Sequence, residues 1–111
     1  MSCLFCKIAA SEIPATLIYS DELVVAFEDI NPQAPHHILI IPVAHFENAA
    51  QLASADPLSL SAIFKAAAKI ASERGLEGYR TVFNTGAAAG QSVFHAHLHL
   101  LGGRAFAWPP G

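Results

Sequence analysis

The sequence predicts an α+β fold built on an antiparallel sheet. Short runs of β-branched, leucine and aromatic residues recur along the chain, and only one long stretch has the period of an amphipathic helix. Two of the runs, Leu17–Tyr19 and Leu23–Phe27, flank a turn at residues 20–22 and predict a hairpin. Strands do not alternate with helices as they do in a parallel sheet. With 111 residues, the chain has room for one core, and we expect a single domain over residues 1–111.

The first part of the chain predicts a short helix and a buried strand around the hairpin. Residues 4–10 predict a short N-terminal helix, which Pro14 ends. Residues 29–35 contain two prolines, which exclude a helix interior or a central strand and predict a loop. Residues 36–42 are apolar at successive positions beyond the start of the run. This pattern predicts a central strand that is buried on both faces.

The main helix begins at Asp56-Pro57, where aspartate can cap and proline suits the first helical position. Gly75 provides a stop. Apolar residues at intervals of three and four form one stripe between them: Leu60, Ile63, Phe64, Ala67, Ile70 and Ala71. The rest of the chain predicts a strand at residues 79–83, a glycine- and alanine-rich loop at 84–92, and a last strand at 94–101.

Three histidines alternate along the last predicted strand, at His95, His97 and His99. The strand period places all three imidazoles on one face. Rings side by side repel one another when protonated and need hydrogen-bond partners when neutral. Three uses of the cluster remain open at this point. The rings can ligate zinc, one of them can attack phosphorus while its neighbours orient it and neutralise charge, or they can act as an acid/base cluster.

The loop at residues 84–92 precedes this strand and favours the second use. Its small residues and backbone amides suit a bound phosphate, although it lacks the lysine of a P-loop. Asp29, at a strand end, can take the two hydroxyls of a ribose or simply cap a turn. The doublet His36-His37 puts one ring on each face of its strand, so only one of them, His37, can join the histidine cluster.

Cys3 and Cys6 form a second candidate site. A Cys-x-x-Cys pair supplies half of a zinc site, and His45 and His95 are candidates for the other two ligands. The alternative is a pair of ordinary thiols in a reducing compartment.

The overall composition argues against several classes of protein. The net charge is −3 and the six lysines and arginines are scattered, which argues against nucleic-acid binding. No apolar run has the length of a transmembrane helix, and the N-terminus lacks the features of a signal peptide, so we expect no membrane partner and a cytoplasmic location. Apolar residues make up 53% of the chain, which suggests a buried subunit interface.

The run from Gly90 to Leu101 resembles the signature of the histidine triad (HIT) family, His-φ-His-φ-His-φ-φ, where φ is apolar. The similarity extends to residues 5–8, 12–14, 27–37 and 40–42 and to His45, and the ending from Leu101 to Gly111 is similar to the histidine triad nucleotide-binding (Hint) branch. Glu28, His36 and Phe94 depart from the usual residues of that branch. The resemblance implies a five-stranded antiparallel sheet with one main helix and a short N-terminal helix. It also implies a homodimer whose sheets join into ten strands.

The resemblance implies a hydrolase that cleaves the P–N bond of purine nucleoside 5′-phosphoramidates and, in some members, releases the nucleotide from aminoacyl-adenylates. His97 would be the nucleophile that takes the nucleotidyl group, with a backbone carbonyl holding its other nitrogen. His99 and His37 would lie around the phosphate, and Ser92 would contact the phosphoryl group or the departing amine. Catalysis would need no cofactor.

The resemblance also assigns the nucleotide and metal contacts. Asp29 would bind the ribose, and the loop residues Asn84, Gly90 and Gln91 would support the phosphate. The base pocket would consist of Phe5, Ile8, Phe27 and Ile30. Cys3, Cys6, His45 and His95 match the pattern of bacterial members that carry a structural zinc. The alternative functions are a nucleotide-binding regulatory module with weak hydrolysis, a dinucleoside polyphosphate hydrolase, and a zinc hydrolase using the three histidines.

Overall fold

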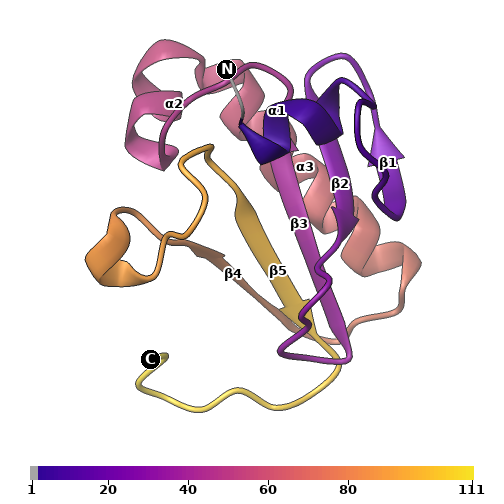
Figure 1. Cartoon of the computed structure of the whole chain (residues 1–111). Coiled ribbons are helices and arrows are strands. Elements are labelled where there is room, and N and C mark those ends of the chain that lie inside the picture. The colour runs from indigo at the N-terminus through magenta and orange to yellow at the C-terminus, as the bar shows by residue number, and fades with distance from the viewer. Residues whose placement is uncertain (1–2) are drawn as a thin grey trace.

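A computed structural model describes residues 3–111 as a five-stranded sheet covered by helices on both faces (Figure 1). The helices are α1 (Leu4–Ala9), α2 (Ala49–Ala55) and α3 (Pro57–Glu73), with a short 3-10 turn η1 (Ala87–Ala89). The strands are β1 (Leu17–Ser20), β2 (Val24–Glu28), β3 (His36–Pro42), β4 (Tyr79–Phe83) and β5 (Leu98–Gly102). All neighbouring strands are antiparallel, in the order β1-β2-β3-β5-β4. The predicted α+β class and the β1–β2 hairpin are therefore confirmed.

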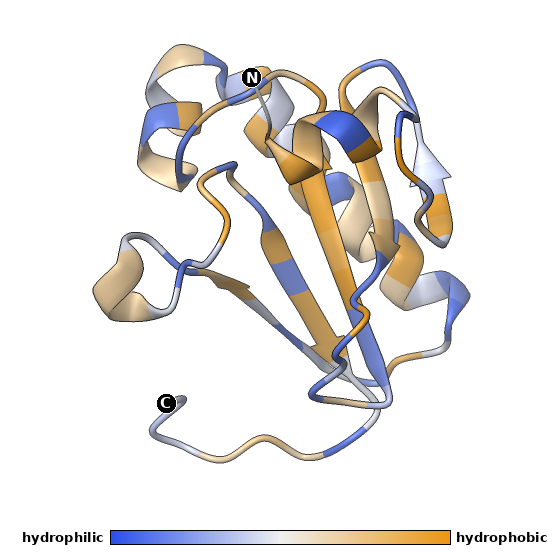
Figure 2. Ribbon diagram, in the orientation of Figure 1, coloured by the Kyte–Doolittle hydropathy of each residue, from blue (hydrophilic) through white to orange (hydrophobic). Residues whose placement is uncertain are grey.

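The two faces of the sheet carry separate cores, and the hydrophobic residues of β2, β3 and β5 colour much of these strands orange in Figure 2. One face packs against α2 and α3, with strand side chains at Val24, Ala26, Ile38, Ile40, Leu98 and Leu100. The other face packs against α1, through Phe5, Ile8, Val25, Phe27, Leu39 and Ile41. Because strand residues alternate between faces, His37 and His99 stand on the α1 face.

The doublet His36-His37 is split between the two faces, as predicted. Arg74, just beyond α3, donates from Nη1 to His36 Nδ1 at 3.1 Å and from Nη2 to Glu28 Oε2 at 2.8 Å. This group joins the end of α3 to β2 and β3 on the face opposite His37.

Helix α2 is absent from the predicted elements. Asn48 caps it by accepting a hydrogen bond from the Gln51 amide at 2.9 Å, and Leu52 is its only buried residue. Seven residues with one buried side chain make no apolar stripe, so helical periodicity could not reveal this element. Asp56, which ends α2, then caps α3 by accepting from the Ser59 amide at 3.2 Å.

Strand β5 begins at Leu98 rather than at Phe94, so only His99 of the three histidines lies in a strand. The last pair of the β3–β5 ladder is Ile40 with Leu98. The ladder ends there because Pro42 has no amide hydrogen to donate, and its carbonyl oxygen is 2.8 Å from His95 Nε2.

The three histidine rings nevertheless lie on the α1 side of the sheet. Phe5 of α1 packs edge-on against His95 and His97, with ring centroids 6.1 and 5.0 Å away. The centroids of His97 and His99 are also 5.0 Å apart. The predicted common orientation is thus produced by an irregular segment leading into β5. Across residues 3–111, no helix is both long enough and apolar enough to cross a bilayer.

Candidate active site and candidate metal site

A cavity of about 370 Å³ lies between α1, the end of β2 and the segment that leads into β5. Eight of the residues assigned to the nucleotide line it: Phe5, Ile8, Phe27, Asp29, Ile30, Ser92, His97 and His99. Sequence reasoning missed the other lining residues, which are Leu4, Ile13, Pro14, Ala15, Thr16, Glu28, Leu39 and Val93. Of these, Leu39 could have been found, because it shares a sheet face with Phe27 and is paired with it across β2 and β3. The cavity therefore combines a largely apolar wall with two carboxylates, two hydroxyls and two imidazoles.

His97 presents an unprotonated ring nitrogen to this cavity. Its Nδ1 lies 2.8 Å from the carbonyl oxygen of His95. Because a carbonyl can only accept, the proton of the neutral ring is on Nδ1 and the lone pair is on Nε2. Within residues 3–111, every buried side-chain nitrogen and oxygen has a hydrogen-bond partner. His97 Nε2 makes no such bond, so this atom must be open to the cavity.

Burial keeps the His97 ring neutral. The side chain is only 6% exposed, and burial lowers its pKa, an effect that the hydrogen bond to the His95 carbonyl opposes. A neutral imidazole with a free lone pair is the form that can act as a nucleophile.

His37 fixes the tautomer of His99. The Gln33 amide donates to His37 Nδ1 at 3.0 Å, so the proton of neutral His37 is on Nε2. That nitrogen is 2.9 Å from His99 Nδ1 and 3.3 Å from Asp29 Oδ2. His99 Nδ1 therefore accepts, and the His99 proton is on Nε2, in the cavity that the ring lines. The result is an N–H donor beside the His97 lone pair.

The same hydrogen bonds argue against a metal at Asp29, His37 and His99. Ligand atoms of these three side chains lie within 4.8 Å of one another, close enough to share an ion. A metal-binding histidine must offer a lone pair. The Gln33 amide already occupies the lone pair of His37 at Nδ1, so its Nε2 keeps the proton. The donor chemistry of this group does not fit a cation.

The titration of His99 tests this arrangement. Burial, followed by the neighbouring His97 and His37 rings, lowers the pKa of His99 to about 4. We expect its ring protons to titrate in NMR near pH 4, whereas an exposed histidine titrates near pH 6.5. Replacing His37 with asparagine should move the midpoint upward, because it removes the neighbouring ring and admits water. A wild-type midpoint near 6.5 would contradict the buried neutral network.

In the predicted phosphate loop, the Gln91 side chain is occupied by hydrogen bonds to the protein itself. Gln91 is buried, its Oε1 accepts from the Gly86 amide at 2.8 Å, and its Nε2 donates to the Glu47 carbonyl at 2.7 Å. Asn84 faces a different groove, beside Trp108, and neither Gly90 nor Gln91 lines the cavity. Of the predicted loop residues, only Ser92 reaches the cavity. Gln91 instead holds the shape of the loop.

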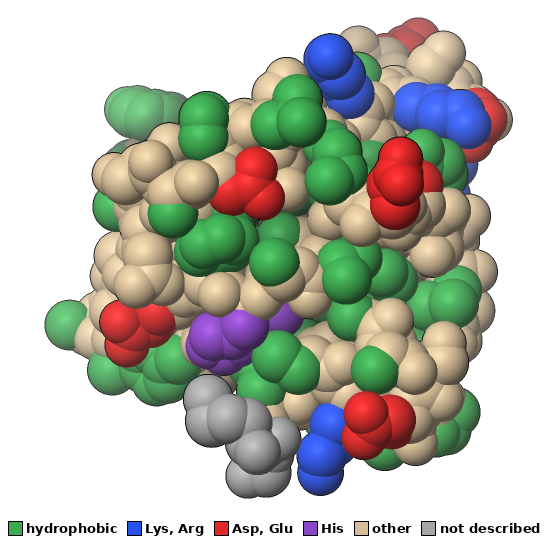
Figure 3. Space-filling view, turned by 90° about the horizontal axis from the view of Figure 1, so that it is seen from above, with side chains coloured by type: hydrophobic (Ala, Val, Ile, Leu, Met, Phe, Trp, Pro, Cys, Tyr) green, Lys and Arg blue, Asp and Glu red, His purple; other side chains and the backbone are tan. Residues whose placement is uncertain are grey.

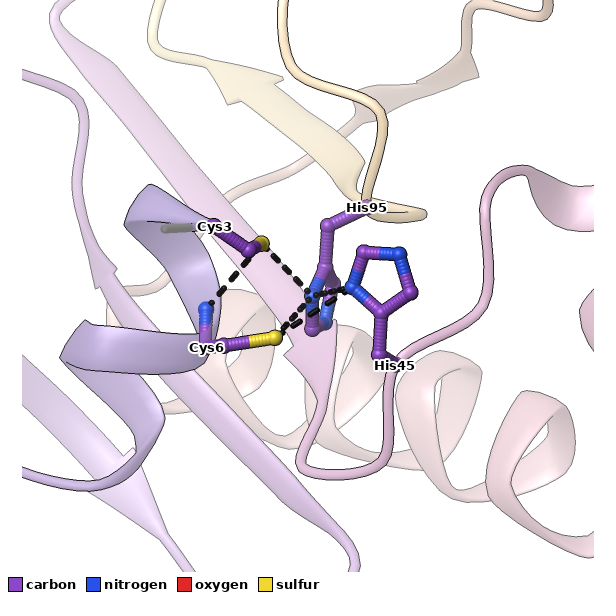
Figure 4. Close-up of side chains that lie close together, drawn as sticks. All are labelled: Cys3, Cys6, His45 and His95. Atoms are coloured by element: carbon purple, nitrogen blue, oxygen red, sulfur yellow. Dashed lines mark hydrogen bonds between the residues drawn. The ribbon is translucent and has the colours of Figure 1, made fainter. Parts of the chain in front are cut away.

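A second cluster brings together Cys3, Cys6, His45 and His95 (Figure 4). His95 Nδ1 is 3.4 Å from each sulfur and 3.2 Å from His45 Nδ1. His45 Nδ1 is also 3.3 Å from the sulfur of Cys6. His45 is exposed, and a view from above shows histidine side chains reaching the surface beside hydrophobic groups (Figure 3). Four donor atoms from three separate segments therefore converge at one point.

The donor set fits a zinc ion. Tetrahedral zinc with bonds of about 2.0–2.3 Å places its donors roughly 3.3–3.8 Å apart, and two thiolates with two imidazoles are a common structural set. The 2.8 Å bond from His95 Nε2 to the Pro42 carbonyl leaves the lone pair of Nδ1 directed at the cluster. Metal-bound histidines typically donate their other N–H in this way.

The protonation of the thiols depends on whether a metal is bound. Burial, and then the adjacent Cys3 thiol, raises the pKa of Cys6 to about 11. Without a cation Cys6 stays protonated, whereas a bound metal displaces the thiol protons. The predicted ligand set is thus assembled, and the backbone groups that orient it, such as the Pro42 carbonyl, left no pattern in the sequence.

The chain is similar to known proteins along most of its length. Residues 10–106 match the family model described as the HIT domain. The chain is 50% identical over 109 residues to an uncharacterized HIT-like protein of Synechococcus elongatus, covering 97% of this chain and 96% of that protein. It is also 50% identical over 112 residues to a 14 kDa zinc-binding protein of Zea mays, covering 97% and 87%. A crystal structure of a HIT family hydrolase from Legionella pneumophila superposes with a TM-score of 0.95 at 51% identity, covering 99% and 100% of the two chains.

Proposed function

The chain belongs to the HIT domain family, and we propose that it is a hydrolase of purine nucleoside 5′-phosphoramidates that works through a covalent nucleotidyl-His97. One observation carries this proposal. The His95 carbonyl holds His97 Nδ1 and leaves the Nε2 lone pair in a cavity whose lining is largely apolar and includes Asp29, Ser92 and His99. We also propose that residues 1–111 form a single HIT domain.

The lining of the cavity supports a nucleotide as the bound group. We propose that the base lies among Phe5, Ile8, Phe27 and Ile30, and that Asp29 accepts from the ribose hydroxyls. Asp29 Oδ1 is already fixed by the Asn31 amide at 2.8 Å, which holds the carboxylate in place for this contact. The phosphate then lies near His97, His99 and Ser92. Asn84, Gly90 and Gln91 act at a distance in this scheme, by shaping the loop.

The reaction then proceeds in two displacements. His97 Nε2 attacks phosphorus and the P–N bond breaks, so the nucleotidyl group is transferred to His97. The departing amine takes a proton. Ser92 lines the cavity and is exposed, so its hydroxyl can pass that proton on and recover it from solvent. Water then cleaves the Nε2–P bond, which restores His97 and releases the nucleoside monophosphate.

His99 and His37 stabilise the charge on the phosphoryl group. The Nε2–H of His99 donates toward the phosphoryl oxygens, and His37 holds it in that tautomer through the 2.9 Å contact. A fixed donor costs little reorganisation when charge develops on the phosphoryl oxygens. His37 is therefore a positioning residue, and every group that these two displacements use comes from the chain itself, from the substrate or from water.

The Cys3, Cys6, His45 and His95 cluster is the proposed structural zinc site. A zinc ion there supplies folding stability by joining α1, the segment after β3 and the segment before β5. The two sites are separate, because none of these four residues lines the nucleotide cavity.

We also propose that two chains join their sheets at β4. The other edge strand, β1, has four residues and an irregular register with β2. Strand β4 has five residues in regular register with β5. A groove of about 540 Å³ runs from its side chains to Trp108, where a second strand can pair. Sedimentation equilibrium should give twice the 11.8 kDa of one chain, and the mass of one chain would contradict this pairing.

The test is release of AMP from adenosine 5′-phosphoramidate at saturating substrate, with a chelator present. We expect hydrolysis to continue, because no metal takes part in the chemistry. AMP binding without turnover would favour a nucleotide-binding module. Loss of turnover on chelation that zinc restores would favour a zinc hydrolase. Faster cleavage of diadenosine polyphosphates than of the phosphoramidate would favour a dinucleoside polyphosphate hydrolase.

A further inference from the structure

His95 belongs to both sites through different atoms. Its side chain contributes Nδ1 to the cysteine–histidine cluster, within 3.4 Å of both sulfurs. Its backbone carbonyl accepts from His97 Nδ1 at 2.8 Å. The ring is fully buried, and its Nε2 is bonded to the Pro42 carbonyl at 2.8 Å, so the ring and the backbone are held together. Whatever fixes the His95 ring therefore also fixes the group that orients the nucleophile.

Helix α1 provides a second connection. Phe5 lies between Cys3 and Cys6 in the sequence, and its ring is 5.5 Å from Phe27, 5.0 Å from His97 and 6.1 Å from His95. Phe5 and Ile8 line the nucleotide cavity. The helix has six residues, too few to be stable without tertiary contacts. Its position therefore depends on the cysteines at one side and the base-pocket residues at the other.

We propose that metal binding at Cys3, Cys6, His45 and His95 sets the affinity of the cavity for the nucleotide, through α1 and the His95 backbone. The proposal rests on the proposed function, because it takes this cavity to be the nucleotide site. When the cluster is filled, Phe5 and Ile8 are held in the wall of the cavity and the His95 carbonyl is held against His97. When it is empty, α1 loses its attachment at the cysteines and the cavity loses one wall. Metal and nucleotide then favour the same conformation.

A coupling of this kind is reciprocal. If zinc tightens nucleotide binding by some factor, the nucleotide must tighten zinc binding by the same factor. Couplings between sites typically amount to about 5–150-fold, and two short connections through one residue and one helix lead us to expect roughly tenfold here. A purely structural zinc, remote from the cavity in its effects, would leave the nucleotide affinity of the folded protein unchanged.

The experiment measures AMP binding by calorimetry on the zinc-loaded and metal-free protein, with circular dichroism to verify folding. We expect AMP to bind about tenfold more weakly to the metal-free protein. Zinc affinity, measured by competition with a chromogenic chelator, should rise by the same factor when AMP saturates the protein. Hydrogen exchange at the amides of residues 4–10 should be faster without metal and slower with it. None of these readouts depends on turnover.

Three variants distinguish the coupling between zinc and AMP binding from a general loss of structure. His45 is exposed and lies outside the cavity, so His45→Ala should lose zinc and bind AMP as weakly as the metal-free protein. His45→Cys keeps a zinc ligand and should restore both. His36→Ala removes a histidine from the opposite face and should change neither affinity. Equal AMP affinity in the folded zinc-loaded and metal-free proteins would overturn the coupling and leave the hydrolase intact. Failure of the zinc-loaded wild type to bind AMP would instead overturn the proposed function.

Discussion

Replacing His97 with alanine should lower kcat/KM for adenosine 5′-phosphoramidate by about 10⁴-fold, or roughly 5.5 kcal/mol of transition-state stabilisation. The variant loses the lone pair of a ring that lines the cavity and is held by a backbone carbonyl. Direct attack by water would have to replace two easier displacements. AMP affinity should change by less than about tenfold, because the apolar wall and Asp29 remain and one polar contact is worth about 1 kcal/mol.

The matched control is His36→Ala, which removes the histidine bonded to Arg74 on the far face of the sheet. Its activity should stay within about twofold of the wild type, as expected for a residue that touches neither substrate nor the catalytic histidines. Substantial turnover by folded His97→Ala would rule out the covalent route. Loss of both turnover and AMP binding would show that the variant damages the cavity rather than the chemistry.

Removing zinc should lower the free energy of unfolding by about 3–4 kcal/mol when free zinc is roughly 100 to 1,000 times its dissociation constant. The ion would be bound by residues of the folded chain that lie as far apart as Cys3 and His95. The unfolded chain does not hold these ligands together, so binding energy becomes folding energy. The melting temperature should fall by roughly 10–20 °C for a chain of this size.

The measurement is thermal unfolding at fixed protein concentration, in excess zinc and in excess chelator. His45→Ala should melt at the same temperature in both conditions, while His36→Ala should keep the wild-type difference. If chelation leaves the wild-type melting curve unchanged, the cluster is two thiols and two histidines without a structural ion.

The sheet and the main helix could be predicted because their signals are local. The segments on either side of the turn at residues 20–22 form the expected strands of the hairpin. The apolar run from Ile38 to Ile41 lies in the expected central strand. The proline after Asp56 begins α3 as expected. In each case the pattern of apolar residues and the local turn or capping residues predict the same element. An element can be predicted from the sequence when these independent signals agree.

The start of β5 could not be predicted from the alternating histidines. Its period of two continues through residues 95–99, but the partner strand ends at Pro42, which cannot extend the ladder. The limit therefore comes from a residue more than fifty positions away. Helix α2 was missed for a different reason, since its single buried side chain, Leu52, leaves no periodic signal.

The candidate site could also be predicted only in part. Eight of the side chains that line the cavity, including those of His97, His99, Asp29 and Ser92, could be named from the motif and its resemblance, whereas the other lining residues could not. Their protonation states depend on backbone groups, namely the His95 carbonyl and the Gln33 amide. Every residue has such groups, so no sequence pattern marks the ones that matter. The same is true of the Pro42 carbonyl, which orients His95 toward the cysteines.

If His97 carries the nucleotidyl group during turnover, the modified protein can be detected. The direct measurement is intact-protein mass spectrometry after rapid mixing with adenosine 5′-phosphoramidate and an alkaline quench, followed by peptide mapping. We expect a transient increase of one adenylyl group, located on the peptide that contains His97 and absent from His97→Ala. Normal turnover with no adduct at any quench time, or an adduct that persists in His97→Ala, would contradict it.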